Sequence, residues 1–177
     1  MRLDLTALLD GSVSTQEWDY AYMPDADGPQ FGEEIRLTQP IGVHVAVGAH
    51  HGYLSVRADA HAAYETECAR CLDTVSCALD VTVERLIETD AAAGNVEHDA
   101  DYADSLLTME NGCVEIDHDI TEELLLSLPM VHLCREDCPG LCPKCGKRLA
   151  DGDCGCASQK EIDPRLAILQ KLLEKNK

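Results

Sequence analysis

Aromatic side chains, basic side chains and long apolar runs are all scarce in this sequence of 177 residues. Aromatic residues make up 4% of the chain, which removes the stacking surfaces on which single-strand nucleic-acid binders usually rely. Only 14 Lys and Arg stand against 33 Asp and Glu, and the resulting formal charge of −19 opposes general binding to phosphate backbones and anionic membranes. Basic partners are favoured instead.

The sequence also has little that resembles a leader, a membrane span or a common active site. No apolar run approaches the ~18 residues of a spanning helix, and the acidic start of the chain does not resemble a signal peptide. Glycine-rich phosphate loops, Gly-x-Ser-x-Gly and His-Glu-x-x-His are absent. We therefore expect a cytoplasmic protein that is not an enzyme.

The negative charge is concentrated in the first three quarters of the chain. Residues 1–133 carry five basic side chains against 26 acidic ones, a formal charge of −21, whereas residues 134–177 carry nine against seven, or +2. The first region should therefore prefer a basic protein partner, and any RNA contact should come from the second, where Lys144, Lys147 and Arg148 cluster.

Alternation of apolar and polar residues predicts an α+β fold built on an antiparallel sheet. The strand-like runs are 35–37, 43–47, 54–60, 62–67, 75–87 and 114–116, with a hairpin connection at 48–52. A short helix is expected from Asp119, as its capping residue, to Leu128, where Pro129 ends it.

Three sections follow from this pattern. Residues 1–34 are expected to be an N-terminal segment, a short helix or strand followed by a loop, and residues 35–133 an acidic antiparallel β domain with an inserted acidic loop at 88–105. Residues 134–177 are expected to form a small cysteine-rich, zinc-binding segment that ends in a helix after Asp163-Pro164.

The strongest motif is a group of six cysteines within 23 residues. These are Cys134, Cys138, Cys142, Cys145, Cys154 and Cys156. In a reducing compartment such spacing indicates metal ligands more often than disulfides. Cys142-Pro-Lys-Cys145-Gly has the form of a zinc knuckle, and tetrahedral zinc then needs one more pair, either Cys154 and Cys156 or Cys134 and Cys138.

A second Cys-x-x-Cys, Cys68-Ala-Arg70-Cys71, lies between two predicted strands and has three readings: a redox pair, a plain β-turn or half of a metal site. One or two zinc ions are compatible with the sequence. In the second case Cys68, Cys71, Cys134 and Cys138 would share one ion, and Cys142, Cys145, Cys154 and Cys156 the other. His132 is expected to be a loop histidine rather than a ligand, and Cys77 a core thiol.

Four separate motifs, in this order, resemble the bacterial YceD family of large ribosomal RNA subunit accumulation proteins. They are Glu67-Cys68-x-Arg70-Cys71-Leu72, Glu122-Glu123-Leu124 with Leu128-Pro129, Cys134-x3-Cys138-x-Gly140-Leu141-Cys142-Pro143-x-Cys145-Gly146, and Asp163-Pro164-Arg165-Leu166. The resemblance carries the family's Cys-x-Arg-Cys signature onto Cys68, Arg70 and Cys71, and its Asp-Pro-Arg signature onto Asp163, Pro164 and Arg165.

The resemblance implies a non-enzymatic role in 23S rRNA accumulation or large-subunit assembly. Our hypothesis is that the acidic domain binds a basic ribosomal protein or an assembly intermediate, while the cysteine-rich segment contacts rRNA or a partner. Two alternatives stay open at this point. One is a redox-regulated zinc-thiolate chaperone or switch, and the other is a zinc enzyme with an open coordination position.

Overall fold

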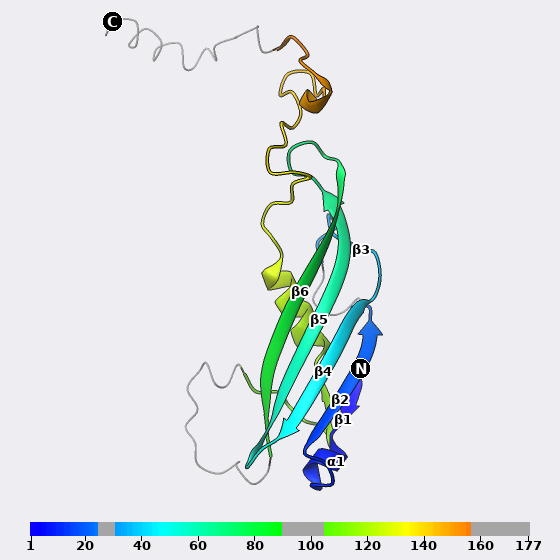
Figure 1. The fold of residues 1–177 in the computed structure, drawn as a ribbon, viewed down its shortest axis with the longest axis vertical. Helices are drawn as coiled ribbons and strands as arrows, with labels where there is room; N and C mark the ends of the chain where they lie inside the picture. Colours follow the sequence, from blue (N-terminus) through cyan, green and yellow to red (C-terminus); the bar gives the residue numbers. More distant parts are fainter. Residues whose placement is uncertain (25–30, 90–104, 157–177) are drawn as a thin grey trace, which may run out of the picture.

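A five-stranded antiparallel sheet is the centre of the computed structural model, which describes residues 1–24, 31–89 and 105–156 (Figure 1). Its strands are β2 (Thr15–Tyr22), β3 (Arg36–Leu37), β4 (Ile41–Ala49), β5 (Tyr53–Glu67) and β6 (Thr74–Glu88). The strand order is β2-β4-β5-β3, and β6 pairs with the other side of β5. The β5–β6 pairing runs without a break from Tyr53 opposite Glu88 to Glu67 opposite Thr74, so this long hairpin is the backbone of the fold.

Smaller elements cover one face of this sheet. They are β1 (Arg2–Asp4), α1 (Thr6–Leu9), β7 (Cys113–Glu115) and α3 (Asp117–Ser127). Strands β1 and β7 pair with each other as a separate two-stranded sheet. The chain after α3 passes the tips of β5 and β6 and ends its described part in the short 3-10 helix η1 (Leu149–Asp151) and the residues that follow (Figure 1). The cysteine-rich segment therefore lies at one end of the long hairpin.

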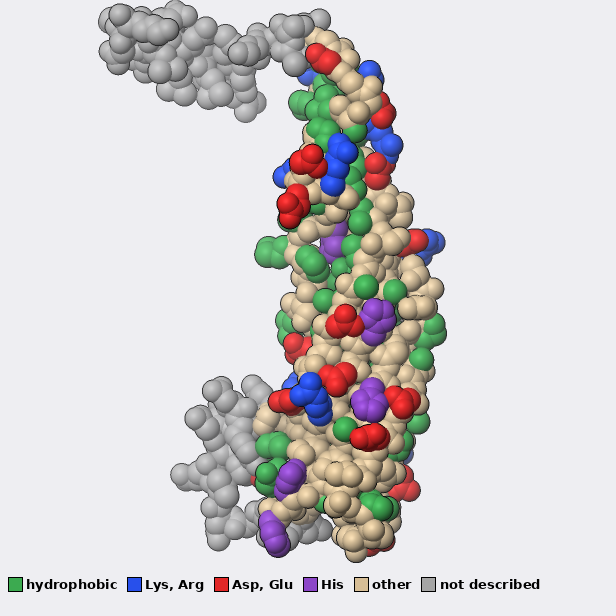
Figure 2. All heavy atoms as spheres, in the orientation of Figure 1, with side chains coloured by type: hydrophobic (Ala, Val, Ile, Leu, Met, Phe, Trp, Pro, Cys, Tyr) green, Lys and Arg blue, Asp and Glu red, His purple; other side chains and the backbone are tan. Residues whose placement is uncertain are grey.

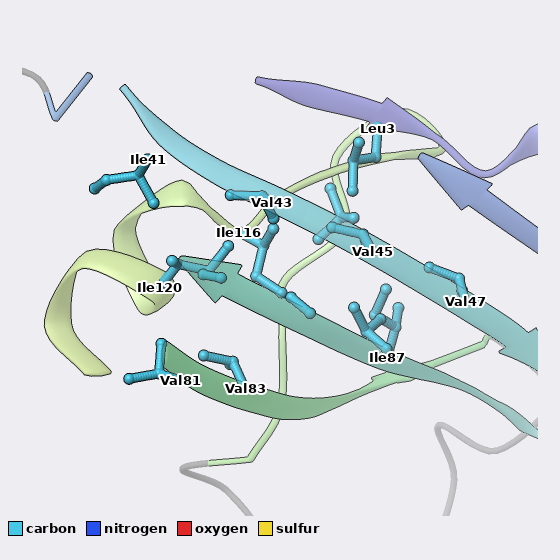
Figure 3. Packing of buried hydrophobic residues seen from close by; sticks show 14 of the residues in the cluster. Leu3, Ile41, Val43, Val45, Val47, Val81, Val83, Ile87, Ile116 and Ile120 are labelled. Atoms are coloured by element: carbon cyan, nitrogen blue, oxygen red, sulfur yellow. The ribbon is translucent and has the colours of Figure 1, made fainter. Parts of the chain in front are cut away.

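The core lies between the sheet and these smaller elements (Figure 3). On β4, residues 41, 43, 45 and 47 are buried in strict alternation because successive strand residues point to opposite faces. Val83 and Ile87 of β6 join this layer, and Ile120 and Leu124 of α3 pack onto it, each at most 1% exposed. Burial of such aliphatic side chains contributes about 1.5–3 kcal/mol each, so the sheet has a core of its own without any metal.

The edge strand β2 is fastened to the start of α3 by two tyrosines. Tyr20 donates its hydroxyl to Asp117 Oδ1 at 2.7 Å, and Tyr22 donates to the Asp117 carbonyl at 3.0 Å. Burial, followed by the Asp117 carboxylate, raises the pKa of Tyr20 above its ordinary value, so the hydroxyl stays a donor. These contacts tie residues far apart in sequence to one side of the fold.

The antiparallel sheet is confirmed, and several details of the sequence prediction are corrected. The run 62–67 is not a separate strand but the end of β5, because the buried alternation continues through Ala60 and Ala62. The helix begins at Asp117 rather than Asp119, and Ile116 precedes it without a side-chain cap. The N-terminal segment contains a strand, a helix and β2, which pairs with β4 along its whole length.

The helix end, the hairpin and a short strand agree with the sequence prediction. Leu128 is extended, as expected for a residue before proline, and ends α3. The β4–β5 turn falls at exposed His50 and His51, and Val114 is buried in β7. Most of the acidic loop 88–105 and the whole predicted C-terminal helix lie outside the described residues. Neither α1 nor α3 is long and apolar enough to span a membrane, and no other described helix is.

Candidate metal centres

Eight of the ten cysteines gather into two groups of four, and all ten are free thiols. We call Cys68, Cys71, Cys134 and Cys138 the first cluster, and Cys142, Cys145, Cys154 and Cys156 the second cluster. Within each cluster the four sulfurs all lie within 4.8 Å of one another. The four sulfurs of each cluster are therefore placed to bind one metal ion.

The first cluster joins the tip of the long hairpin to the segment after α3. Cys68 and Cys138 are 0% and 3% exposed, and their sulfurs are 3.9 Å apart. The sulfurs of Cys71 and Cys134 are 3.7 Å apart. A regular ZnS4 tetrahedron with ~2.3 Å bonds has sulfur–sulfur edges of about 3.8 Å, so the observed spacing fits one tetrahedral ion.

The Cys-x-x-Cys between β5 and β6 is folded as a knuckle. The amide of Cys68 donates to the Asp73 carbonyl at 2.7 Å, and the amide of Leu72 donates back to the Cys68 carbonyl at 2.9 Å. Leu72 has a φ of 62°, a left-handed conformation that glycine usually occupies. This tight turn directs both sulfurs to the same side, so the metal half-site is the reading that the geometry favours.

The second cluster contains the same turn. The amide of Cys142 donates to the Lys147 carbonyl at 2.8 Å, and the amide of Gly146 donates to the Cys142 carbonyl at 2.8 Å. Gly146 has a φ of 70° and stands at the position that Leu72 holds in the first knuckle. The two knuckles are therefore geometric equivalents, although their sequences share little beyond the two cysteines.

The remaining ligands of the second cluster come from a local loop. Cys154 and Cys156 are half-buried, whereas Cys142 is 6% exposed and Cys145 is exposed. The loop turns at Gly152 and Gly155, which have φ values of 111° and 73°. All four ligands of this cluster therefore lie within residues 142–156, with no contribution from the sheet.

Arg70, the arginine of the Cys-x-Arg-Cys motif, holds the loop that carries Cys138. Its guanidinium donates to the carbonyl of Cys138 at 2.9 Å and to that of Glu136 at 3.3 Å, while its own carbonyl accepts from Leu141 at 3.1 Å. Gly140 passes so close that an added Cβ would lie 2.9 Å from the Arg70 carbonyl oxygen. The residue between the two cysteines thus connects both clusters.

A second link between the clusters is an ion pair. Arg148, from the knuckle of the second cluster, pairs with Asp73, which closes the knuckle of the first. A small cavity of about 110 Å³ lies beside this ion pair. Its lining includes Cys71 and Cys134 of the first cluster and Arg148. The two clusters are therefore neighbours at one end of the molecule and are fastened to each other by backbone and side-chain contacts.

Backbone amides lower the pKa of one thiol in each cluster. Amides of Arg70 and Cys134 donate to the Cys68 sulfur and lower the pKa of that thiol to about 6. Amides of Cys145 and then Lys144 do the same for Cys142, whose pKa is also lowered to about 6. Because metal ligation requires deprotonated sulfur, this lowering of the pKa favours metal binding at both knuckles.

Crowding has the opposite effect on other members of the clusters. Burial, and then the neighbouring thiols, raise the pKa of Cys71 to about 12. The thiols of Cys145 and Cys154 raise the pKa of Cys156 to about 12. Several thiolates so close together repel one another, and a bound cation removes that repulsion. The chemistry of the donor set therefore suits a thiophilic divalent ion.

All six cysteines proposed as ligands in the tail are in the two clusters, and Cys68 and Cys71 complete the first one. His132 is not among them, since its Nε2 lies 2.9 Å from the Tyr64 hydroxyl and its ring meets that tyrosine edge-on. Cys77 and Cys113, on β6 and β7, are half-buried and outside both clusters. The residues Asp163, Pro164 and Arg165 lie outside the described residues.

The sequence analysis named Gly140 only as part of the family motif, without a structural role, and it did not name Asp73. A signal for Gly140 is present in the sequence as a glycine between two ligand cysteines, but its contact with Arg70 depends on the fold. Asp73 has no sequence signal, because its role follows from the pairing of its carbonyl with Cys68 and of its carboxylate with Arg148.

Fold and site together define an antiparallel β protein that carries two four-cysteine clusters at one end of its central hairpin. A family model described as "Large ribosomal RNA subunit accumulation protein YceD" matches residues 56–173, so the chain belongs to the YceD family. The matched range contains both clusters, Arg70 and Gly140.

Curated relatives are found in mycobacteria. An uncharacterized protein of Mycobacterium tuberculosis strain H37Rv is 33% identical over 107 residues, which cover 60% of this chain and 49% of that protein. One from Mycobacterium bovis has the same values, and one from Mycobacterium leprae is 32% identical over 84 residues, covering 48% of this chain and 37% of that protein. The chain thus spans about half the length of the curated relatives it matches, or less. No solved structure matches it.

Proposed function

We propose that this protein is a non-enzymatic ribosome-biogenesis factor that supports accumulation of 23S rRNA during assembly of the large ribosomal subunit. The observation that carries the proposal is membership of a family named for large ribosomal RNA subunit accumulation. The charge of −21 on residues 1–133 adds a physical reason, because such a surface attracts basic ribosomal proteins and steers their association.

The cofactor in this proposal is structural zinc, with one ion in each cluster. Four thiolate ligands on one ion fill a tetrahedral coordination shell and leave no open position, which is the arrangement of structural rather than catalytic zinc. The ion of the first cluster would hold the tail against the tip of the β5–β6 hairpin, where the sheet's own core does not reach, and the ion of the second would close the local loop of the tail. Native mass spectrometry of the full chain should give two zinc ions per chain.

The partner is best sought among large-subunit precursors. The tagged chain should enrich large-subunit proteins or 23S precursors from its native cells at low salt, and the enrichment should fall at high salt because exposed charges are screened. Depletion of the protein should lower the ratio of 23S to 16S rRNA. Absence of both the enrichment and the rRNA effect would overturn the proposal.

The basic residues of the second knuckle are the proposed rRNA contact. Lys147 and Arg148 lie in the hairpin that carries Cys142 and Cys145, on the part of the chain whose side chains are net basic. Replacement of Lys147 by Ala should weaken binding of 23S precursors uniformly and reduce its salt dependence, as removal of one phosphate contact does. Glu136→Gln, in the same tail, is the matched control with no expected loss.

The exposure of the second cluster supports one alternative function, a redox-regulated zinc-thiolate switch. Cys145 is exposed and its partners Cys154 and Cys156 are half-buried, so an oxidant such as hydrogen peroxide could reach them. In that case mild peroxide would release zinc from the second cluster and increase binding of an apolar dye. Retention of both ions and unchanged dye binding would exclude the switch.

A further inference from the structure

Among the described residues, the edge of β6 that faces away from β5 is unpaired over much of its length and has a defined hydrogen-bonding side. Leu86 donates its amide to the Ser105 carbonyl at 2.8 Å and accepts from the Leu107 amide at 2.8 Å, so its backbone groups point away from β5. Backbone direction alternates along an antiparallel strand, and therefore the amides and carbonyls of Ser76, Ala78, Asp80 and Thr82 point to the same side.

These four residues have no backbone partner on that side within the described part of the chain. Their side chains are all exposed, and the outward pairing seen at Leu86 stops there. Residues 105–107 already lie against Leu86 in parallel orientation, which shows that this edge accepts an extended segment. The free edge from residue 76 to residue 82 continues the same line.

Two exposed side chains on the outer face of β6 are acidic, Asp80 within this edge and Glu84 just beyond it, whereas Ser76, Ala78 and Thr82 are uncharged. Asp80 and Glu84 project from the outer face of β6 with 82% and 70% of their side chains exposed, and Asp59 of β5 lies opposite Thr82 between them. Arg57 pairs with Glu84 and Asp59, and His61 lies 2.7 Å from Asp80. Figure 2 shows the red acidic and purple histidine side chains along this face of the sheet.

The alternate residues of β6 offer a different surface. Cys77 and Leu79 are half-buried and point to the face on which α3 packs. A strand added at this edge would therefore meet exposed side chains that include Asp80 and Glu84 with one set of alternating residues, and apolar side chains with the other. That is the recognition mode of β-strand addition, in which backbone bonds give affinity and alternate side chains give specificity.

We propose that the edge of β6 binds an extended, lysine- or arginine-rich segment of a partner protein as an added β-strand. The charge on the edge selects this occupant over a second copy of the chain, because two β6 edges side by side would bring Asp80 and Glu84 against acidic side chains of the same sheet. The identity of the partner, a basic ribosomal protein, rests on the proposed function. The inference adds that this partner binds by strand addition to β6.

The probe is a capped octapeptide of alternating Lys and Val, added to the full metal-loaded chain. Hydrogen exchange of the outward amides of Ala78, Asp80 and Thr82 should slow by about tenfold or more on binding, whereas the inward amides of Val81 and Val83 should be unchanged. The same peptide with an N-methyl group on every residue should give no protection, because neither of its edges can then donate a hydrogen bond. A peptide of alternating Glu and Val should not bind.

Ala78→Pro tests the backbone contact in the protein. Proline removes an outward N–H that has no partner in the described fold, so the edge should tolerate it while peptide affinity falls by about tenfold or more. Ala78→Val keeps the N–H and is the matched control. Asp80→Asn should weaken binding by about two- to fivefold at low salt and less at high salt.

Several results would overturn the proposal. These are equal affinity of the proline and valine variants, no protection of the outward amides, equal binding of the N-methylated peptide, or a dimer that protects these amides without peptide. The N-methylated peptide decides the matter even if Ala78→Pro misfolds. Absence of large-subunit enrichment by the wild-type chain would count against the proposed function, whereas enrichment by Ala78→Pro equal to wild type would count against the edge alone.

Discussion

The two cysteine clusters share one knuckle geometry but are embedded differently in the molecule. The first cluster joins residues that are 63 and 70 positions apart in sequence and buries three of its four ligands. The second closes a local loop within residues 142–156 and leaves Cys145 exposed. The difference indicates that the first cluster decides where the tail lies, whereas the second shapes only the tail itself.

The largest contrast should come from removing one ligand of each cluster. Cys138→Ser should lose the ion of the first cluster and release the segment from His132 to Gly140, because the remaining hydrogen bonds of that segment to Tyr64, Ala69 and Arg70 contribute only about 1 kcal/mol each. Cys145→Ser should lose the other ion and leave that segment in place. Metal content should fall from two ions to one in both variants. Limited proteolysis should distinguish the variants, because only Cys138→Ser should expose the segment from His132 to Gly140 to cleavage.

The sheet provides the internal control for this pair of variants. Since its core contains no cluster residue, slow exchange of the β4 and β5 amides should persist in both. Global unfolding in Cys138→Ser, or equal protease sensitivity in the two variants, would contradict the division of roles between the clusters.

A smaller effect is expected where the clusters meet, at Gly140. An alanine there would have a φ of 75° and a Cβ 2.9 Å from the Arg70 carbonyl oxygen. Together these should destabilise the folded protein by about 2–3 kcal/mol, measured by denaturant unfolding. Gly146→Ala is the matched control, because its φ of 70° is similar but no atom lies within 4 Å. It should cost only about 1–2 kcal/mol; equal losses would mean that the contact with Arg70 is unimportant.

Arg70→Lys should act on one cluster alone. Lysine keeps the charge but lacks the planar fork that donates to the Cys138 and Glu136 carbonyls, so the first cluster should bind metal about tenfold more weakly. The second cluster should keep its affinity. Competition with a chromophoric chelator measures the metal affinity of each cluster. An equal loss of affinity at the two clusters would show that Arg70 does not act through the Cys138 loop.

The sequence predicted the sheet and the ligands better than it predicted their connections. Alternation at Val43, Val45 and Val47 identified strands because burial on one face leaves a period-two pattern. The cysteines were identified because thiols at knuckle spacing have few other uses in a reducing compartment. The sequence could offer the pairing of Cys68 with Cys138 only as one possibility, because this pairing depends on how the tail returns to the hairpin. The alternation of apolar and polar residues carries no information about such a long-range contact.

One residue explains why the sequence did not show that the two knuckles are equivalent. The second knuckle has Gly146 at its left-handed position, which is a recognisable signal, whereas the first has Leu72, for which left-handed geometry is unfavourable by about 1–2 kcal/mol. The Cys-x-x-Cys of the first cluster therefore reads equally as a plain turn. Only the backbone bonds between Cys68, Leu72 and Asp73 establish what it is.

The smallest predicted effect tests this residue directly. Leu72→Gly should stabilise the metal-loaded protein by up to about 1 kcal/mol, because relief of the left-handed strain is partly offset by the greater freedom of glycine in the unfolded chain. Leu72→Ala keeps most of the strain and, since the leucine is 59% exposed, should change the unfolding midpoint little. If Leu72→Gly instead destabilises the protein by more than 1 kcal/mol while Leu72→Ala does not, the strain argument fails. If neither variant loses stability but both lose enrichment of large-subunit material, the exposed leucine is retained for contact with a partner, because only binding would then explain a strained apolar side chain at the surface of the knuckle.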